Sequence, residues 1–144
     1  MTKVFSVVGT SKRGKTTLIN QLTTILRKKG YTTCVVKHTD HFLTYKDFDH
    51  EGKDTFTYAE AGADEVWLTS PSFTYHAKPV ETALEEIITL SKADFILTEG
   101  FKNAETKKII IKSPGETIVV KGEVIYIIEG EYNPEEIADI LIHS

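Results

Sequence analysis

Eight residues near the start of the chain, G-T-S-K-R-G-K-T at positions 9–16, constrain its fold more than any other feature. They match the pattern G-x-x-x-x-G-K-[ST] and stand between a short apolar run, residues 4–8, and an amphipathic stretch. A glycine-rich turn that leaves a buried strand and opens a helix is the context in which this pattern cradles phosphates. The pattern therefore predicts a strand, a phosphate loop and a helix in direct succession.

The stretch after the loop has the period of an α-helix. Its apolar residues fall on one face: Leu18, Ile19, Leu22, Ile25 and Leu26. It ends in two lysines followed by Gly30, and cations and glycine both suit a helix C-terminus. We therefore predict a helix that begins at about residue 16 and packs its apolar face on a sheet.

The chemistry of the loop follows from its residue types. Glycines let backbone N–H groups turn toward phosphate oxygens, and the helix N-terminus adds positive potential. Lys15 supplies a mobile charge for the terminal phosphates, and the Thr16 hydroxyl can enter a magnesium shell. Arg13 either contacts phosphate or is solvated. The residues that we predict to bind the nucleotide here are Gly9, Thr10, Ser11, Lys12, Arg13, Gly14, Lys15 and Thr16.

Proteins with such a loop usually need an acid at the end of a neighbouring strand to hold magnesium or its waters. Glu99 follows the apolar run at residues 95–97 and is the best-placed candidate, with Lys15 the second catalytic residue that we predict. Asp94 begins the same run, so it should lie at the opposite edge of the sheet. Asp54 is a further candidate metal ligand, although a helix N-cap at Asp54 or Thr55 explains it as well.

Residues 38–53 are polar, lack periodicity and contain three histidines and three aspartates. A loop of this length in a small domain is usually functional or mobile. His38 and His41 form an H-x-x-H pattern, but no helix fixes their rings on one face, so the transition-metal signal is weak. Solvated histidines, or histidines that hold the triphosphate or an anionic partner, are the alternatives.

The rest of the chain alternates strands and helices, which predicts an α/β fold with helices on both faces of a mainly parallel sheet. We expect one domain, residues 1–144, with a three-layer architecture of the P-loop NTPase type. A Pro-Gly turn in the last third favours some antiparallel pairing there. Further strands are predicted at residues 32–37, 66–68, 95–97, 109–111, 117–120 and 124–128, and further helices at 54–61, from Pro79 to about 88, and from Pro134 to 142.

The composition bounds the function. A net charge of −4 and a pI of about 5.7 do not suggest a nucleic-acid partner. The single cysteine excludes an intrachain disulfide. No apolar stretch approaches the length of a membrane span, and no signal sequence precedes the first strand. We expect a cytoplasmic protein with no membrane contact.

Four separated motifs occur in order along the chain: the phosphate loop, K-H-x-x-H at 37–41, G-K-D at 52–54, and T-E-G-F-K at 98–102. Together they resemble the MobB family, the molybdopterin-guanine dinucleotide biosynthesis protein B family, over residues 1 to about 102. The resemblance implies a small, dimeric GTP-binding protein with weak magnesium-dependent GTPase activity that assists attachment of GMP to molybdopterin. It implies that Gly14, Lys15, Thr16 and Thr17 contact phosphate and magnesium, and that Glu99 is the family's acidic residue.

The resemblance also implies a partner, the molybdenum cofactor guanylyltransferase, and allows contact with molybdopterin. The loop at residues 38–53 is the segment that we expect to meet that partner. Family members commonly carry a basic residue shortly after the G-K-D aspartate, where Thr57 stands here. Lys53 or Lys102 would then have to contact the anion instead.

Two other functions compete with an accessory GTPase: a non-catalytic nucleotide-binding adaptor and a P-loop small-molecule kinase. No arginine-bearing lid of the kinase type is recognisable in the sequence. The segment S-K-A-D at 91–94 superficially resembles the N-K-x-D guanine reader of other GTPases, but it precedes its strand instead of following one. The choice of guanine over adenine therefore rests on the family resemblance.

Overall fold

The computed structural model, which describes residues 1–10 and 14–144, divides the chain into two units. The first consists of Met1–Thr39 together with Leu84–Ser144, and the second consists of Asp40–Ala83. The larger unit contains a parallel sheet, and the smaller contains a short antiparallel sheet. The phosphate-loop motif lies in the first unit.

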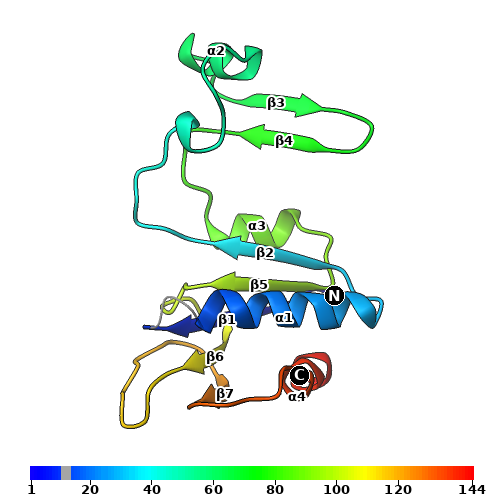
Figure 1. Cartoon of the computed structure of the whole chain (residues 1–144), viewed down its shortest axis with the longest axis vertical. Helices are drawn as coiled ribbons and strands as arrows, with labels where there is room; N and C mark the ends of the chain where they lie inside the picture. The colour runs from blue at the N-terminus through cyan, green and yellow to red at the C-terminus, as the bar shows by residue number, and fades with distance from the viewer. Residues whose placement is uncertain (11–13) are drawn as a thin grey trace. The chain divides into compact units, whose positions relative to one another are not determined.

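The sheet of the first unit has five strands, and every pairing in it is parallel. Figure 1 shows the strands side by side in an order that differs from their order along the chain. That order is β2 (Thr33–Lys37), β5 (Phe95–Glu99), β1 (Lys3–Gly9), β6 (Lys107–Ile111) and β7 (Val124–Ile128). The predicted α/β fold with a mainly parallel sheet is confirmed, and β1 lies at its centre.

One face of this sheet carries the main apolar core. Helix α1 (Gly14–Lys28) buries the five residues that its period predicted, and helix α4 (Pro134–His143) adds Ile137, Ala138 and Leu141. These side chains pack with alternate residues of the strands, among them Phe5, Val7 and Leu97. Because α1 follows the phosphate loop directly, its burial fixes the end of the loop on the sheet.

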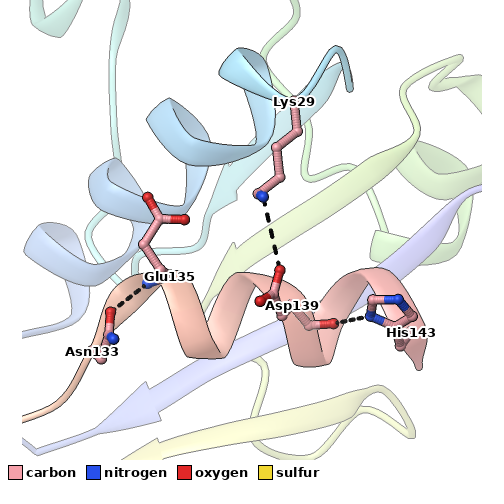
Figure 2. Close-up of polar contacts among 5 residues, drawn as sticks. All are labelled: Lys29, Asn133, Glu135, Asp139 and His143. Atoms are coloured by element: carbon pink, nitrogen blue, oxygen red, sulfur yellow. Dashed lines mark hydrogen bonds and ion pairs between the residues drawn. The ribbon is translucent and has the colours of Figure 1, made fainter.

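Helix α4 shows how its sequence sets its start. The side chain of Asn133 caps the helix by accepting a hydrogen bond from the Glu135 amide at 3.0 Å (Figure 2). A proline occupies the first turn. Lys29, just beyond α1, lies 3.9 Å from the Asp139 carboxylate of α4. Both side chains are largely exposed, so this ion pair adds little stability.

The opposite face is covered differently. The connection from β1 to β2 crosses the sheet in one direction, and the connection from β2 to β5 crosses it in the opposite direction. Because both connections are right-handed, helix α3 (Leu84–Leu90) lies on the face away from α1. This gives the third layer. The prediction that Pro79 opens the helix is wrong: the helix starts at Leu84, which is buried, while Val80 is 65% exposed.

A row of polar side chains runs across this second face, where the chain passes from β5 over β1 to β6 without a helix. Thr98 donates a hydrogen bond to Ser6 Oγ at 2.8 Å, and Ser6 Oγ lies 2.6 Å from Thr106 Oγ1. The fully buried Lys108 ammonium donates to the carbonyls of Ala104 and Thr106 at 2.6 and 2.7 Å. Burial lowers the pKa of Lys108. The lysine thus satisfies backbone carbonyls that the irregular crossover leaves without a ladder partner.

The last third of the chain departs from the prediction in two ways. Strands β6 and β7 pair in parallel, so the antiparallel pairing predicted for this region is wrong, and residues 117–120 form no strand. The predicted type II turn is present, with Glu116 N donating to Ser113 O at 3.0 Å and Gly115 at φ +81°. A turn of this type joins β6 to an irregular excursion and not to a hairpin partner.

The second unit contains helix α2 (Asp54–Glu60) and the antiparallel strands β3 (Val66–Thr69) and β4 (Thr74–Ala77). The sequence predicted α2 and β3 but not β4. The one tryptophan of the chain, Trp67, stacks on His76 across the hairpin with ring centroids 3.6 Å apart. The His76 ring also lies 2.7 Å from the Glu65 carboxylate. Within residues 1–10 and 14–144, no helix combines the length and apolar character that crossing a membrane requires.

Candidate nucleotide-binding site

The candidate site lies at the carboxyl edge of the five-stranded sheet. Parallel strands end at the same edge, and the register places Val7 of β1 opposite Glu99 and Lys37 of β2 opposite Glu99 as well. Gly9 closes β1 at this edge, and the phosphate-loop motif continues from it. The predicted acidic residue therefore lies on the strand next to the loop, as its place after a buried run indicated.

The two motif glycines pack closely against β6. A Cβ atom on Gly9 would lie 2.5 Å from the carbonyl oxygen of Ile111, far inside a normal contact. A Cβ atom on Gly14 would lie 3.3 Å from Cγ2 of the same isoleucine. Both ends of the loop thus rest on the last residue of β6, which leaves no room for a side chain at Gly9.

The lysine and threonine of the motif occupy the first turn of α1. Lys15 Nζ donates a hydrogen bond to the Gly9 carbonyl at 2.8 Å, so its charge is folded back across the start of the loop. Thr16 Oγ1 donates to Glu99 Oε1 at 3.1 Å. Thr17 follows on the same helix and is exposed. The structure thus brings together Gly9, Lys15, Thr16 and Glu99.

Glu99 has a second partner that the sequence did not identify as a site residue. Its other carboxylate oxygen lies 3.4 Å from Lys37 Nζ, at the end of β2. The Glu99 side chain is only 13% exposed, whereas the Lys37 side chain is 69% exposed. A lysine at the end of a predicted parallel strand was the available signal, but only the strand order β2-β5-β1 makes it a neighbour of Glu99.

The oxygen atoms at this edge suit a magnesium ion. Mg²⁺ prefers carboxylate, hydroxyl and water oxygens, and it is commonly held by one or two protein ligands plus phosphates. The Thr16 hydroxyl and the Glu99 carboxylate already lie within hydrogen-bond distance of each other. Elsewhere the described residues contain no group of three or more His, Cys, Asp or Glu side chains arranged as a metal site.

The segment after Glu99 has an unusual backbone. Gly100 and Phe101 adopt φ angles of +95° and +60°, and the Gly100 amide donates to the Val7 carbonyl at 3.1 Å. A positive φ is uncommon for a residue with a side chain and marks local strain. The Phe101 ring lies 5.5 Å from the His38 ring, so His38 belongs to the same edge as Glu99.

On the other side of the loop, toward β6, a second carboxylate meets the motif. Thr10 Oγ1 donates to Glu116 Oε2 at 2.7 Å, and the Ser113 amide donates to Glu116 Oε1 at 3.0 Å. The hydrogen bonds from Ser113 and then Thr10 lower the pKa of Glu116. Lys112 Nζ donates to the Glu116 carbonyl at 2.9 Å and lies 3.5 Å from Glu129. Glu116 was not identified from the sequence.

Other predicted site residues lie elsewhere. Ser11, Lys12 and Arg13 fall outside the described residues, so their predicted phosphate contacts stay predictions. His41, Lys53 and Asp54 belong to the second unit. Lys53 is the N-cap residue of α2, and Asp54 is its first helical residue, so the predicted N-cap at Asp54 or Thr55 is wrong. A carboxylate in the first turn still suits the helix dipole.

A parallel sheet with strand order β2-β5-β1-β6-β7 and a G-x-x-x-x-G-K-T loop between the central strand and α1 defines the P-loop class of α/β proteins. Within that class, the family model of molybdopterin guanine dinucleotide synthesis protein B (MobB) matches residues 4–129. The chain therefore belongs to the MobB family.

Relatives and solved structures agree. The molybdopterin-guanine dinucleotide biosynthesis adapter protein of Escherichia coli (strain K12) is 35% identical over 129 residues, which cover 80% of this chain and 71% of that protein. The protein of the same name from Haemophilus influenzae is 32% identical over 113 residues, 75% of this chain and 62% of that protein.

Among solved structures, a crystal structure of molybdopterin-guanine biosynthesis protein B aligns with a TM-score of 0.72 at 26% identity over 97% of both chains. Bacillus subtilis MobB aligns with a TM-score of 0.68 at 24% identity over 90% of this chain and 79% of that one. At this lower identity, the second likeness supports the fold alone.

Proposed function

We propose that this chain is a GTP-binding adapter protein of molybdopterin-guanine dinucleotide biosynthesis, with slow magnesium-dependent GTP hydrolysis. The observation that carries the proposal is the Lys15, Thr16 and Glu99 cluster beside the phosphate loop. It supplies a cation for phosphates and two oxygen ligands for a metal. Family membership and the relatives' role in this pathway support the assignment of the pathway and of guanine.

The residues of the cluster change partners when a triphosphate binds. Lys15 leaves the Gly9 carbonyl and donates to the terminal phosphates, where its charge stabilises the negative oxygens. Thr16 and Glu99 would hold Mg²⁺ or its waters, and the ion would neutralise charge on the terminal phosphates. Lys37 continues to hold the second Glu99 oxygen, which keeps the carboxylate at the edge of the sheet.

Slow hydrolysis follows from the residues available. Fast P-loop GTPases orient the attacking water with a glutamine and neutralise the transition state with an arginine finger. The one glutamine of this chain, Gln21, lies within α1 and accepts a hydrogen bond from Tyr132 at 2.6 Å. Of its two arginines, Arg27 is in the last turn of α1 and Arg13 is in the loop motif. We therefore expect turnover well below the ~1–100 s⁻¹ of kinases.

The first experiment is calorimetric titration of the full chain with GTP and ATP, with and without magnesium. We expect GTP to bind more tightly and magnesium to strengthen binding. Lys15→Ala should weaken GTP binding by about 100-fold or more, because a charge-assisted phosphate contact is lost. Lys28→Ala, at the far end of the same helix, is the matched control. Unchanged affinity in Lys15→Ala would remove the phosphate-loop assignment.

The second experiment concerns the partner, which we propose to be the guanylyltransferase that joins GMP to molybdopterin. In this proposal a homodimer of the chain engages it through residues 38–53, and molybdopterin is a possible further contact. Nucleotide-bound switch segments order in other GTPases, so GTP should strengthen the complex. Co-purification with and without GTP, for wild type and a His38→Ala/His41→Ala variant, tests this. Binding that ignores both GTP and the histidines would exclude the loop.

Phosphate release in the steady state separates a slow GTPase from a purely nucleotide-holding adaptor and from a kinase. A slow release that needs magnesium and no acceptor supports the GTPase. Release that depends on an added small-molecule acceptor would favour a kinase instead. No release at all, with nucleotide still bound, would leave an adaptor that only binds.

A further inference from the structure

We infer that Glu116 is the residue that selects guanine, by accepting hydrogen bonds from the N1–H and 2-amino groups of the base. This inference rests on the proposed function, because it assigns the nucleoside end of the same nucleotide site. It goes further by naming the side of the phosphate loop on which the nucleoside lies and the group that reads it.

The direction of the nucleotide follows from the position of the metal ligands. A magnesium ion held by Thr16 and Glu99 would neutralise the terminal phosphates, so we expect these phosphates on the side of the loop that holds these two residues. Glu99 ends β5, which pairs with β1 on one side, and β6 pairs with β1 on the other. The nucleoside is at the opposite end of the triphosphate from the metal. It therefore extends away from β5, toward β6 and the turn that follows it.

That turn places a carboxylate directly against the loop. The motif residues Gly9 and Gly14 both rest on Ile111, the last residue of β6, and the turn at residues 113–116 begins two residues later. Thr10 of the loop donates a hydrogen bond to Glu116 over a sequence separation of 106 residues. A carboxylate in this position would repel phosphate oxygens, whereas it can accept from the N–H donors of a nucleobase.

The chemistry of the carboxylate favours guanine over adenine. Two donors, the Thr10 hydroxyl and the Ser113 amide, hold one oxygen each and keep the group ionised and oriented. An ionised carboxylate offers about four acceptor positions, so about two remain for a ligand. Guanine presents two adjacent donors on its Watson–Crick edge, which a carboxylate can accept together. Adenine presents one donor beside an acceptor, and that acceptor would face the negative oxygen.

The neighbouring acid, Glu129, has a different role. It lies at the end of β7, 3.5 Å from Lys112, and among the described residues no hydrogen bond joins it to the phosphate loop. Lys112 also donates to the Glu116 carbonyl at 2.9 Å, so it links the turn after β6 to the end of β7. Glu129 is therefore a matched control: it is a carboxylate on the same side of the sheet with a lysine partner.

The test measures the affinity of the full chain for four magnesium-loaded ligands: inorganic triphosphate, GTP, ITP and ATP. ITP lacks the 2-amino group of GTP. Wild type should bind GTP more tightly than ITP or ATP. Glu116→Gln should lose about tenfold or more of its GTP affinity, as expected for a hydrogen bond to a charged group. Its affinity for inorganic triphosphate should not fall, because the substitution removes a negative charge beside the loop. Glu129→Gln should keep the wild-type preference for GTP.

Several outcomes would overturn the inference. An unchanged GTP preference in Glu116→Gln, an equal loss for inorganic triphosphate, or loss of preference in Glu129→Gln alone would each remove Glu116 as the guanine reader. With 2′-deoxy-GTP as a fifth ligand, a loss seen with GTP but not with the deoxy analogue would assign the carboxylate to the ribose instead. Wild type that binds GTP and ATP equally would defeat this inference but not the phosphate loop. Wild type that binds none of the four ligands would defeat the proposed function itself.

Discussion

Two acidic residues, Asp94 and Glu99, lie at the two ends of β5, one at the amino edge of the sheet and the other at the carboxyl edge. Their surroundings differ. At the amino edge, Asp94 accepts hydrogen bonds from the Thr32 amide at 2.8 Å and the Thr32 hydroxyl at 3.0 Å. At the carboxyl edge, Glu99 meets the Thr16 hydroxyl and the Lys37 ammonium. Asp94 is held by a backbone amide, whereas Glu99 is held by side-chain groups that can rotate.

This difference separates a structural acid from a candidate functional one. A backbone donor cannot leave its partner without moving the chain, so Asp94 locks the start of β2 beside the start of β5. The Thr16 hydroxyl can rotate toward an incoming ligand at small cost while Lys37 keeps the other Glu99 oxygen, so Glu99 can exchange one of its partners. The same residue class on one strand thus takes two roles, and the direction of the strand decides which.

The largest effect should come from adding a methyl group at Gly9, where the start of the phosphate loop packs against β6. In Gly9→Ala the added methyl group would meet the Ile111 carbonyl at 2.5 Å, so backbone must move. We expect a stability loss of about 3 kcal/mol or more and loss of nucleotide binding. In Gly14→Ala the contact is a side-chain methyl at 3.3 Å, so the loss should be smaller. Chemical denaturation measures both, and an equal loss would contradict the packing argument.

Removing the buried ammonium of Lys108, near the start of β6, should have the next largest effect. Lys108→Met leaves the carbonyls of Ala104 and Thr106 without their donor, at a cost of about 1–3 kcal/mol. The partly exposed neighbour Lys107 provides the control, because Lys107→Met should change stability little. Urea midpoints compare the two. A Lys108→Met protein as stable as wild type would mean that the crossover segment finds other donors.

The comparison of the two edges is tested directly by Glu99→Gln. Because the amide is a weaker magnesium ligand than a carboxylate, we expect the gain in GTP affinity on adding magnesium to fall by about tenfold. Asp94→Asn, on the same strand, should leave the magnesium effect unchanged. Titrations with and without metal decide this. A similar loss in both variants would show that the edges do not differ in function.

The smallest effect concerns acid stability. The Thr32 amide and hydroxyl lower the pKa of Asp94 below its ordinary value of 3.8. A carboxyl whose pKa falls on folding adds stability above its unfolded pKa and loses it as the pH falls through the folded pKa. Asp94→Asn should therefore lower the Tm by a few degrees at neutral pH, and the gap should narrow below about pH 4. If thermal melts showed the same difference in Tm between wild type and Asp94→Asn across this pH range, they would contradict a stabilising role for the Thr32 hydrogen bonds.

The parts of the fold that local chemistry determines could be predicted from sequence. The buried face of α1 follows from the 3.6-residue period of Leu18 to Leu26, and the start of α4 follows from Asn133 and Pro134. Glu99 could be found because a parallel strand presents its last residue at the ligand edge. These signals lie within a few residues of the structure that they specify, so no tertiary information is needed.

The parts that depend on strand order could not be predicted. Lys37 becomes a partner of Glu99 only because β2 pairs with β5, and Glu116 meets Thr10 across 106 positions. A pattern of alternating polarity does not distinguish Lys108, buried by a crossover, from a solvated lysine. The run at residues 117–120 has strand composition, yet it pairs with nothing in the sheet, because β7 takes the place beside β6.

The single tryptophan gives the molecule a built-in optical reporter. Trp67 is in the second unit, stacked on His76, and the phosphate loop is in the first. Its emission therefore reports on the surroundings of the hairpin. An emission change on adding GTP would mean that the surroundings of the hairpin change when nucleotide binds. A silent tryptophan with proven binding would mean that the hairpin does not sense occupancy of the loop.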